Sequence, residues 1–267
     1  MEKNIKNKVV VITGASRGIG YSIADTFLNE GAKHLVILDI NEEVGEKAAT
    51  TLNSKFGAKK VSFFKCDVII DLDRVFDKIL EKFKTIDILI NNAGVLHEQC
   101  IKKTIAVNTT ALIEWTMKFW DCARKDKGGA GGTVINVASL YGFLVDPFLP
   151  FYKASKHAVL GFTRTIGHRI NYDQTGVRVI AICPGFTKTA LVENTQLNTS
   201  LEFQNEKFIN FMNMSVWMEV GDLAKAVAEM FGKADSGTCW IKFGDEPLTE
   251  LRVPPEFRSE NYIKGEL

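Results

Sequence analysis

The chain has 267 residues and a formal net charge of +1, and it is 46% hydrophobic and 24% charged. These values are ordinary for a globular protein with a buried core, and open α/β sheets often reach this length as one domain. The 33 basic residues nearly balance the 32 acidic residues, and no basic stripe stands out. We therefore expect no nucleic acid and no membrane as a partner.

The cysteines, the histidines and the N-terminus narrow the class of protein further. Five cysteines without a Cys-x-x-Cys pair and four scattered histidines predict neither a disulfide framework nor a metal site. The first residues are largely polar and lead directly into an apolar run, so we expect no signal segment. No apolar run is long enough to cross a bilayer. Together these features favour a cytoplasmic protein.

Apolar runs alternate with helical patterns along the chain, which is typical of βαβ units and a parallel sheet. Seven runs are predicted strands: Val9–Thr13, Leu35–Asp39, Val61–Lys65, Ile86–Asn91, Gly132–Val137, Arg178–Cys183 and Cys239–Phe243. The pattern predicts one α/β domain over residues 1–267, built as a Rossmann-type doubly wound parallel sheet of about seven strands.

The first predicted strand ends in a glycine-rich turn that runs into a helical pattern. Gly14, Gly18 and Gly20 would let the backbone approach a pyrophosphate, whose charge is attracted by a helix N-terminus. The second strand ends at Asp39, nineteen residues after Gly20. A carboxylate there accepts the hydroxyls of an adenosine ribose and repels a 2′-phosphate, which predicts NAD rather than NADP. Arg17 favours the opposite choice, because a guanidinium in this turn could hold a 2′-phosphate.

A tyrosine and a lysine four residues apart, Tyr152 and Lys156, follow Ser139 at a distance of thirteen residues. On one helix this spacing puts both side chains on the same face. We expect the Lys156 ammonium to lower the pKa of the Tyr152 phenol toward that of a general base. Ser139 could hydrogen-bond a substrate oxygen beside it. The spacing alone is weak, but with the dinucleotide turn it predicts oxidation of an alcohol.

These motifs resemble the short-chain dehydrogenase/reductase family, and the resemblance runs over nearly the whole chain. Beyond the glycine turn it is carried by Asp67, Asn91-Asn92-Ala93-Gly94, Asn108, Ser139, Tyr152-x-x-x-Lys156 and Pro184-Gly185. Some stretches look like the NAD-dependent 15-hydroxyprostaglandin dehydrogenase branch and others look like insect alcohol dehydrogenases. Both branches use NAD to oxidise alcohols, so the difference concerns the substrate.

The resemblance implies a complete set of site residues. The implied catalytic residues are Asn108, Ser139, Tyr152 and Lys156, with Asn108 in a water-mediated proton relay behind Lys156. The implied NAD-binding residues are Gly14, Arg17, Gly18, Ile19, Gly20, Asp39, Asp67, Val68, Asn91, Ala93, Gly94, Tyr152, Lys156, Pro184, Gly185, Phe186 and Thr187. Asp67 is expected at the adenine, Asn91, Ala93 and Gly94 along the ribose wall, and Thr187 at the carboxamide.

Residues 191–217 lie where this architecture places a substrate lid, and they are rich in aromatic and methionine side chains. The members are Phe203, Phe208, Phe211, Met212, Met214 and Trp217. They predict a small lipophilic alcohol or ketone as substrate, although such side chains also form cores and subunit interfaces. The favoured function is NAD-dependent oxidation of a lipophilic secondary alcohol. The alternatives are an NADPH-dependent carbonyl reductase and a catalytically silent cofactor-binding protein.

Two helical segments predict the assembly. The stretch Thr104–Arg124 and the helix that carries Tyr152 have more apolar side chains than one sheet face needs. The resemblance implies that these helices pair across a two-fold axis in a homodimer. The C-terminal arm, residues 252–267, could then reach the partner. The alternative is a monomer in which the same side chains pack beneath the sheet.

Overall fold

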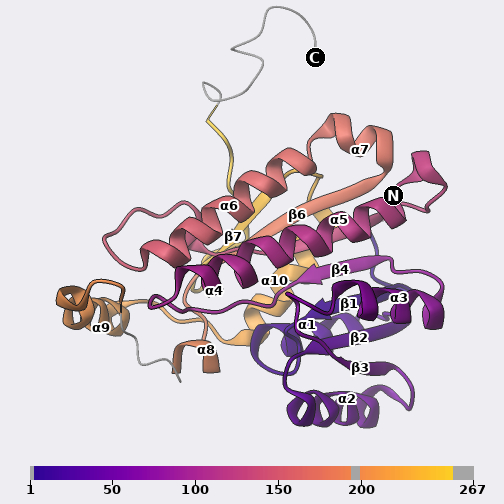
Figure 1. Cartoon of the computed structure of the whole chain (residues 1–267), viewed down its shortest axis with the longest axis horizontal. Coiled ribbons are helices and arrows are strands. Elements are labelled where there is room, and N and C mark those ends of the chain that lie inside the picture. Colours follow the sequence, from indigo (N-terminus) through magenta and orange to yellow (C-terminus); the bar gives the residue numbers. More distant parts are fainter. Residues whose placement is uncertain (1–2, 194–198, 255–267) are drawn as a thin grey trace, which may run out of the picture.

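The computed structural model describes residues 3–193 and 199–254. Within them, one eight-stranded sheet has the order β3-β2-β1-β4-β5-β6-β7-β8, and helices lie on both of its faces (Figure 1). Neighbouring strands from β3 to β7 pair in parallel, and β8 pairs antiparallel with β7. The strands are β1 (Val9–Thr13), β2 (His34–Asp39), β3 (Val61–Lys65), β4 (Ile88–Asn91), β5 (Gly132–Val137), β6 (Val177–Pro184), β7 (Cys239–Lys242) and β8 (Thr249–Glu250).

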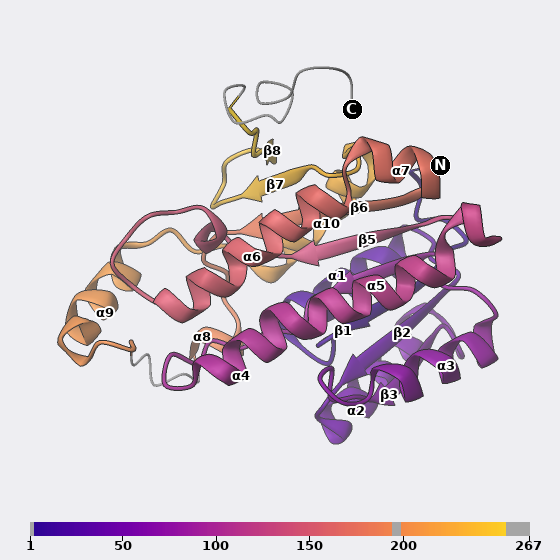
Figure 2. The ribbon, with the colours of Figure 1, turned by 45° about the horizontal axis from the view of Figure 1, so that its top comes forward.

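The helices form two layers (Figure 2). One face of the sheet packs against α1 (Gly18–Asn29), α2 (Glu42–Phe56) and α10 (Val220–Lys233). The other face packs against α3 (Leu72–Phe83), α5 (Leu112–Ala123) and α6 (Pro150–Ile166). The shorter helices are α4 (Ile101–Ile105), α7 (Arg169–Thr175), α8 (Ala190–Glu193) and α9 (Asn205–Met214).

The strands are apolar on both sides because helices cover both faces, as expected for a parallel sheet. In β1, Val10 and Ile12 point to the α1 and α10 layer, whereas Val11 points to the α3 and α5 layer. All three side chains are fully buried. Full burial of such a side chain contributes about 1.5–3 kcal/mol each. All seven predicted strands are present, and their observed ends differ from the predicted ends by at most two residues.

The eighth strand is the feature that the sequence did not predict. Thr249–Glu250 has only two residues and follows a turn, so it shows no apolar alternation. It closes the sheet edge by pairing with Trp240 and Ile241. Of the predicted C-terminal arm, residues 252–254 are described and 255–267 lie outside the described residues. No helix in the described ranges is long and apolar enough to span a membrane.

A row of buried polar side chains ties two helices to the sheet. The Asn91 Nδ2 atom, on β4, donates to the Thr116 Oγ1 of α5 (2.9 Å) and to the Asn136 Oδ1 of β5 (3.0 Å). The Asn136 Nδ2 atom donates in turn to the Thr163 Oγ1 of α6 (2.9 Å). The row fixes α5 and α6 relative to β4 and β5. Its atoms lie inside the core.

Candidate active site

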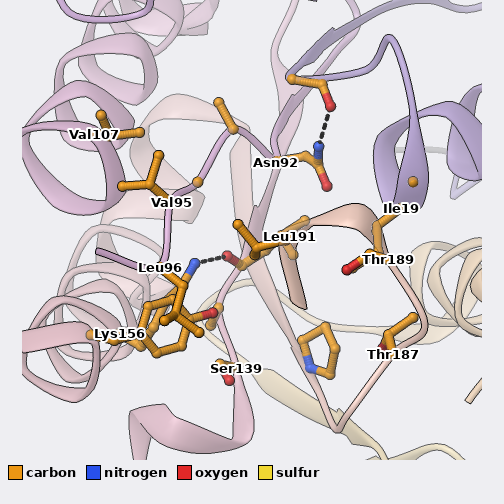
Figure 3. Close-up of a pocket in the computed structure, with 18 of the residues that line it drawn as sticks. Ile19, Asn92, Val95, Leu96, Val107, Ser139, Lys156, Thr187, Thr189 and Leu191 are labelled. Carbon is orange, nitrogen blue, oxygen red and sulfur yellow. Dashed lines mark hydrogen bonds between the residues drawn. The ribbon is translucent and has the colours of Figure 1, made fainter. Parts of the chain in front are cut away.

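A cavity of about 470 Å³ opens beyond the carboxyl ends of the central strands, where open α/β sheets bind their ligands. It lies between the turn after β1 and the loop after β4, which is where the strand order reverses. Figure 3 shows Ser139 and Lys156 on one side of the cavity and Ile19 and Asn92 on another. The predicted residues that line it are Gly14, Arg17, Gly18, Ile19, Asp39, Asp67, Val68, Ala93, Gly94, Ser139, Tyr152, Lys156, Pro184, Gly185, Phe186 and Thr187.

The glycine turn is packed closely against the loop after β4 at Gly14 and Gly20. Gly14 has a φ of +62°, and a Cβ there would lie 2.8 Å from the Cα of Ala93. A Cβ on Gly20 would lie 2.6 Å from the Asn92 Nδ2 atom. That amide donates to the carbonyls of Thr13 (3.0 Å) and Gly14 (2.8 Å). Gly20 therefore acts by close packing of α1 and does not line the cavity itself.

The Asp39 carboxylate is held in place at the end of β2. Its Oδ2 accepts from the Ser16 amide (3.1 Å) and the Ser16 hydroxyl (2.6 Å), and its Oδ1 accepts from the Asn41 amide (3.0 Å). Asp67, after β3, is fixed in a similar way, because its Oδ1 accepts from the Ile69 amide (2.9 Å). Both carboxylates line the cavity, and hydrogen bonds from backbone amides fix their positions.

The three residues of the Ser-Tyr-Lys pattern meet at the opposite end. Ser139 follows β5 in an extended conformation, and its Oγ accepts from the Tyr141 amide (3.2 Å). Tyr152 and Lys156 lie one turn apart on α6. Lys156 is 4% exposed, and its Nζ donates to the Val137 carbonyl (2.9 Å). The same Nζ lies 5.6 Å from the centroid of the Tyr152 ring.

The charges at this end differ from the sequence-based expectation. Burial raises the pKa of Tyr152 to about 12, and a hydrogen bond with Ser139 partly offsets that rise. Burial also lowers the pKa of Lys156 to about 8. The expectation that Lys156 lowers the pKa of Tyr152 is therefore wrong for this structure. The ammonium is directed to the Val137 carbonyl, and Ser139 is the group that favours the phenolate.

Asn108 lies behind the cavity wall and does not line the cavity. It is fully buried in a π-helical segment, Ala106–Ala111, that joins α4 to α5; such segments are frequent at functional sites. Its Oδ1 accepts from the Val95 amide (2.8 Å), and its Nδ2 donates to the Val95 carbonyl (2.9 Å) and the Ser155 Oγ (3.1 Å). The side chain thus ties the loop after β4 to α6, and its place in a proton relay stays a prediction.

Asn91 was expected along the ribose wall, but the structure puts its side chain in the core. Its amide belongs to the row with Thr116 and Asn136, and the residue does not line the main cavity. The next residue, Asn92, lines it instead. In a strand, successive side chains point to opposite faces. The motif Asn-Asn alone does not say which asparagine faces the ligand.

Glu98 is a site residue that the sequence did not reveal. It is 1% exposed, and its carboxylate accepts from the backbone amides of Tyr152 (2.7 Å) and Phe151 (3.3 Å) at the start of α6. The first amides of a helix have no partner within the helix, and a negative charge there is favourable. Glu98 therefore anchors the turn that carries the Tyr152 side chain, from 54 residues away.

The predicted lid divides into three groups. Phe208 and Met212, on α9, line the cavity and are buried. Phe211 and Trp217 pack behind them, with Phe211 5.4 Å from Phe148 and Trp217 5.4 Å from Phe186, measured between ring centroids. Phe203 and Met214 are 74% and 79% exposed. Residues 194–198 of the lid lie outside the described residues.

Comparisons with known proteins agree with this geometry. A family model for short chain dehydrogenases matches residues 8–200. The 15-hydroxyprostaglandin dehydrogenase (NAD(+)) of Macaca fascicularis is 37% identical over 234 residues, which cover 87% of this chain and 83% of that protein. The enzyme of the same name from Homo sapiens is 36% identical with the same coverage.

Solved structures give the same result for the fold. A 3-ketoacyl-(acyl-carrier-protein) reductase from Brucella melitensis, complexed with NADH, has a TM-score of 0.75 at 25% identity and is matched over 91% of this chain and 99% of that chain. Levodione reductase has a TM-score of 0.76 at 25% identity, over 90% and 97%. The family match covers most of the residues that build the sheet and the cavity, and the chain belongs to the short-chain dehydrogenase family.

Proposed function

We propose that this protein uses NAD to oxidise a lipophilic secondary alcohol to the corresponding ketone. The observation that carries the proposal is a single cavity with the fixed Asp39 carboxylate at one end and Ser139, Tyr152 and Lys156 at the other. The relatives at 36–37% identity are named as NAD(+) enzymes that act on a hydroxyprostaglandin. A small-molecule substrate and a cytoplasmic location complete the proposal.

The chemistry of the donor set fits NAD. Gly14 and Gly18 line the cavity without a side chain, so backbone can approach a pyrophosphate there. Asp39 offers a carboxylate whose position is fixed by Ser16 and Asn41, suited to the ribose hydroxyls. A 2′-phosphate would meet a like charge at contact distance. Arg17 also lines the cavity, and its guanidinium favours NADP. We expect the Asp39 carboxylate to dominate, because it lies at the ribose itself.

The reaction needs a base, an orienting donor and a positive charge, and this chain offers one of each. The alcohol oxygen would lie between the Ser139 hydroxyl and the Tyr152 phenol, and Tyr152, in the phenolate form that the hydrogen bond with Ser139 favours, would remove the hydroxyl proton. Bound NAD supplies the hydride acceptor. Lys156, with a pKa of about 8, can take up or release a proton near neutral pH. The apolar wall from Phe208 and Met212 would exclude water from the reacting carbon.

The test compares Tyr152→Phe with wild type, using aliphatic secondary alcohols and NAD. We expect turnover to be lost while NAD affinity, measured by fluorescence titration, is nearly unchanged, because only the proton-accepting oxygen is removed. Tyr172→Phe, on α7 away from the cavity, makes the same chemical change and should keep full turnover. Substantial turnover in Tyr152→Phe would refute the proposed base.

We also propose a homodimer in which α5 and α6 face the partner. Part of the apolar surface behind this prediction is already covered within one chain, since Leu112, Phe119, Trp120 and Val159 are buried. The surface left for a partner comes from half-buried Ile113, Met117, Phe162 and Ile166. Light scattering at micromolar concentration tests it, because a mass of 29.7 kDa would mean a monomer. The contact of the arm, residues 252–267, with the partner stays a prediction.

A further inference from the structure

Tyr141 presents a buried hydroxyl that the protein itself does not satisfy. The residue sits in the 3-10 turn Leu140–Gly142, directly after Ser139, and it lines the cavity. Its side chain is 5% exposed, and its hydroxyl has no hydrogen-bond partner among the described residues. Most buried polar side-chain atoms in proteins have a partner, so an exception beside an active site requires an explanation.

The ring that carries this hydroxyl is held from three sides. It packs edge-on against Tyr152 at 6.1 Å and against Phe186 at 6.0 Å, between centroids. The Lys153 Nζ lies 5.0 Å from the ring centroid, and that ammonium is itself fixed by the Asp146 carboxylate at 2.6 Å. A ring with neighbours on these sides cannot easily turn its hydroxyl to water or to a protein acceptor.

The turn beneath the ring is fixed as well. The Tyr141 amide donates to the Ser139 Oγ (3.2 Å). A Cβ on Gly142 would lie 2.7 Å from the Leu160 Cδ1 and 3.0 Å from the Lys156 carbonyl, so the turn packs directly on α6. The position of the hydroxyl is therefore set by the same helix that positions Tyr152.

The two phenols beside the cavity differ in their hydrogen bonds. Burial, with added repulsion from Asp146 and Tyr152, raises the pKa of Tyr141 far above its usual value. Tyr141 is therefore a neutral phenol at every physiological pH, able to donate and to accept a hydrogen bond. Tyr152 is paired with Ser139. Tyr141 has no such partner among the described residues, so its hydroxyl is suited to hold a polar group.

We propose that Tyr141 determines specificity by hydrogen-bonding a second oxygen of the substrate. The substrate class is then an aliphatic chain that carries the reacting secondary alcohol and, a few carbons away, another hydroxyl or carbonyl group. The remaining wall fits the chain, because Leu96, Leu149, Phe208 and Met212 line the same cavity. This inference rests on the proposed function, since it assumes that an alcohol is bound at Tyr152.

One competing occupant is a water molecule shared with Asp146. The Asp146 Oδ2 atom is also buried without a partner among the described residues, although Asp146 does not line the cavity. A water that joins the two groups would contribute equally to every substrate. A second substrate oxygen, in contrast, contributes only for substrates that contain it. The two possibilities therefore differ in how one substitution affects different substrates.

The experiment crosses Tyr141→Phe with a substrate series. The series contains 2-octanol and derivatives with a second hydroxyl or keto group moved stepwise along the chain. We expect wild type to prefer at least one difunctional member, and Tyr141→Phe to lower kcat/KM for that member by about tenfold while 2-octanol is unchanged or improved. Tyr172→Phe is the matched control and should not alter the preference.

Binding is measured beside turnover, by calorimetry on the NAD-saturated protein with the corresponding ketones. The role of Tyr141 would be overturned if Tyr141→Phe lowered the affinity and kcat/KM equally for all members of the series. It would also be overturned if wild type showed no preference for a difunctional member. A preference in binding that Tyr141→Phe removes, in a protein without turnover, would support Tyr141 and refute the proposed oxidation. The melting temperature of Tyr141→Phe should equal or exceed that of wild type, because the unpaired hydroxyl is gone.

Discussion

The buried ammonium of Lys156 should cost the protein stability that a neutral side chain of similar length would restore. Among the described residues its Nζ has one hydrogen-bond acceptor, the Val137 carbonyl, and its pKa falls from 10.5 to about 8. At about 1.36 kcal/mol per pKa unit, this difference corresponds to roughly 3 kcal/mol. Lys156→Met removes that cost but leaves the Val137 carbonyl unpaired, which costs about 1–3 kcal/mol. At pH 7 we expect the variant to be as stable as wild type or up to about 2 kcal/mol more stable.

The pH dependence gives the sharper test, because the unpaired carbonyl cancels from it. The Lys156 pKa is lower in the folded protein than in the unfolded chain, so the unfolded chain binds more protons between about pH 8 and 10.5. Stability must therefore rise with pH in this window, and the cost is fully present below pH 8. Between pH 7 and 9, Lys156 should add about 1.3 kcal/mol to wild-type stability. Lys156→Met should lack this gain.

Urea unfolding at pH 7, 8 and 9, at one protein concentration, measures both quantities. Other titrating groups that do not contact Lys156, such as the buried Cys66 and Cys239, affect both proteins and cancel in the comparison. Lys78→Met, at an exposed position on α3, should leave the pH slope as in wild type. The reasoning fails if Lys156→Met keeps the wild-type slope, or if it is destabilised by more than about 3 kcal/mol at pH 7.

Three further substitutions test the site. Asp39→Asn removes a charge but keeps an acceptor, so the preference for NAD over NADP should shrink about tenfold or more in fluorescence titrations; an unchanged ratio would contradict the role of Asp39. Glu98→Ala leaves two buried amides unpaired and should cost about 1–3 kcal/mol in urea unfolding and lower kcat, whereas unchanged values would mean that α6 needs no anchor. Gly14→Ala places a Cβ 2.8 Å from the Ala93 Cα at a φ of +62° and should weaken NAD binding; an NAD affinity equal to that of wild type would show that the turn tolerates a side chain. The control is Gly161→Ala, whose Cβ has nothing within 4 Å and which should stabilise α6 by about 0.5–1 kcal/mol.

The sequence predicted those parts of the site that depend on neighbours along the chain. The turn from Gly14 to Gly20, the carboxylate at a strand end and the spacing of Tyr152 and Lys156 are all local patterns. Each needs only a strand or a helix to set its geometry. The alternation of apolar runs predicted the sheet for the same reason, and Thr249–Glu250 was missed because two residues carry no period.

What the sequence did not reveal depends on contacts between distant segments. Glu98 reaches Tyr152 across 54 residues, and no motif links the two. The direction of the Asn91 side chain depends on Thr116 and Asn136 being opposite it. The pKa of Tyr152 depends on burial, which follows from packing and not from the four-residue spacing to Lys156.

The row Thr116–Asn91–Asn136–Thr163 has a consequence for how this sequence can diverge. An apolar replacement at Asn91, Asn136 or Thr163 removes a hydrogen-bond partner of the next polar side chain in the row, inside the core, which is expensive. Joint replacement by apolar groups of the same shape can be nearly neutral. Mutations at these positions are therefore accessible to evolution mainly in combination. A lineage that retains Asn136 is under pressure to retain Asn91 and Thr163 as well.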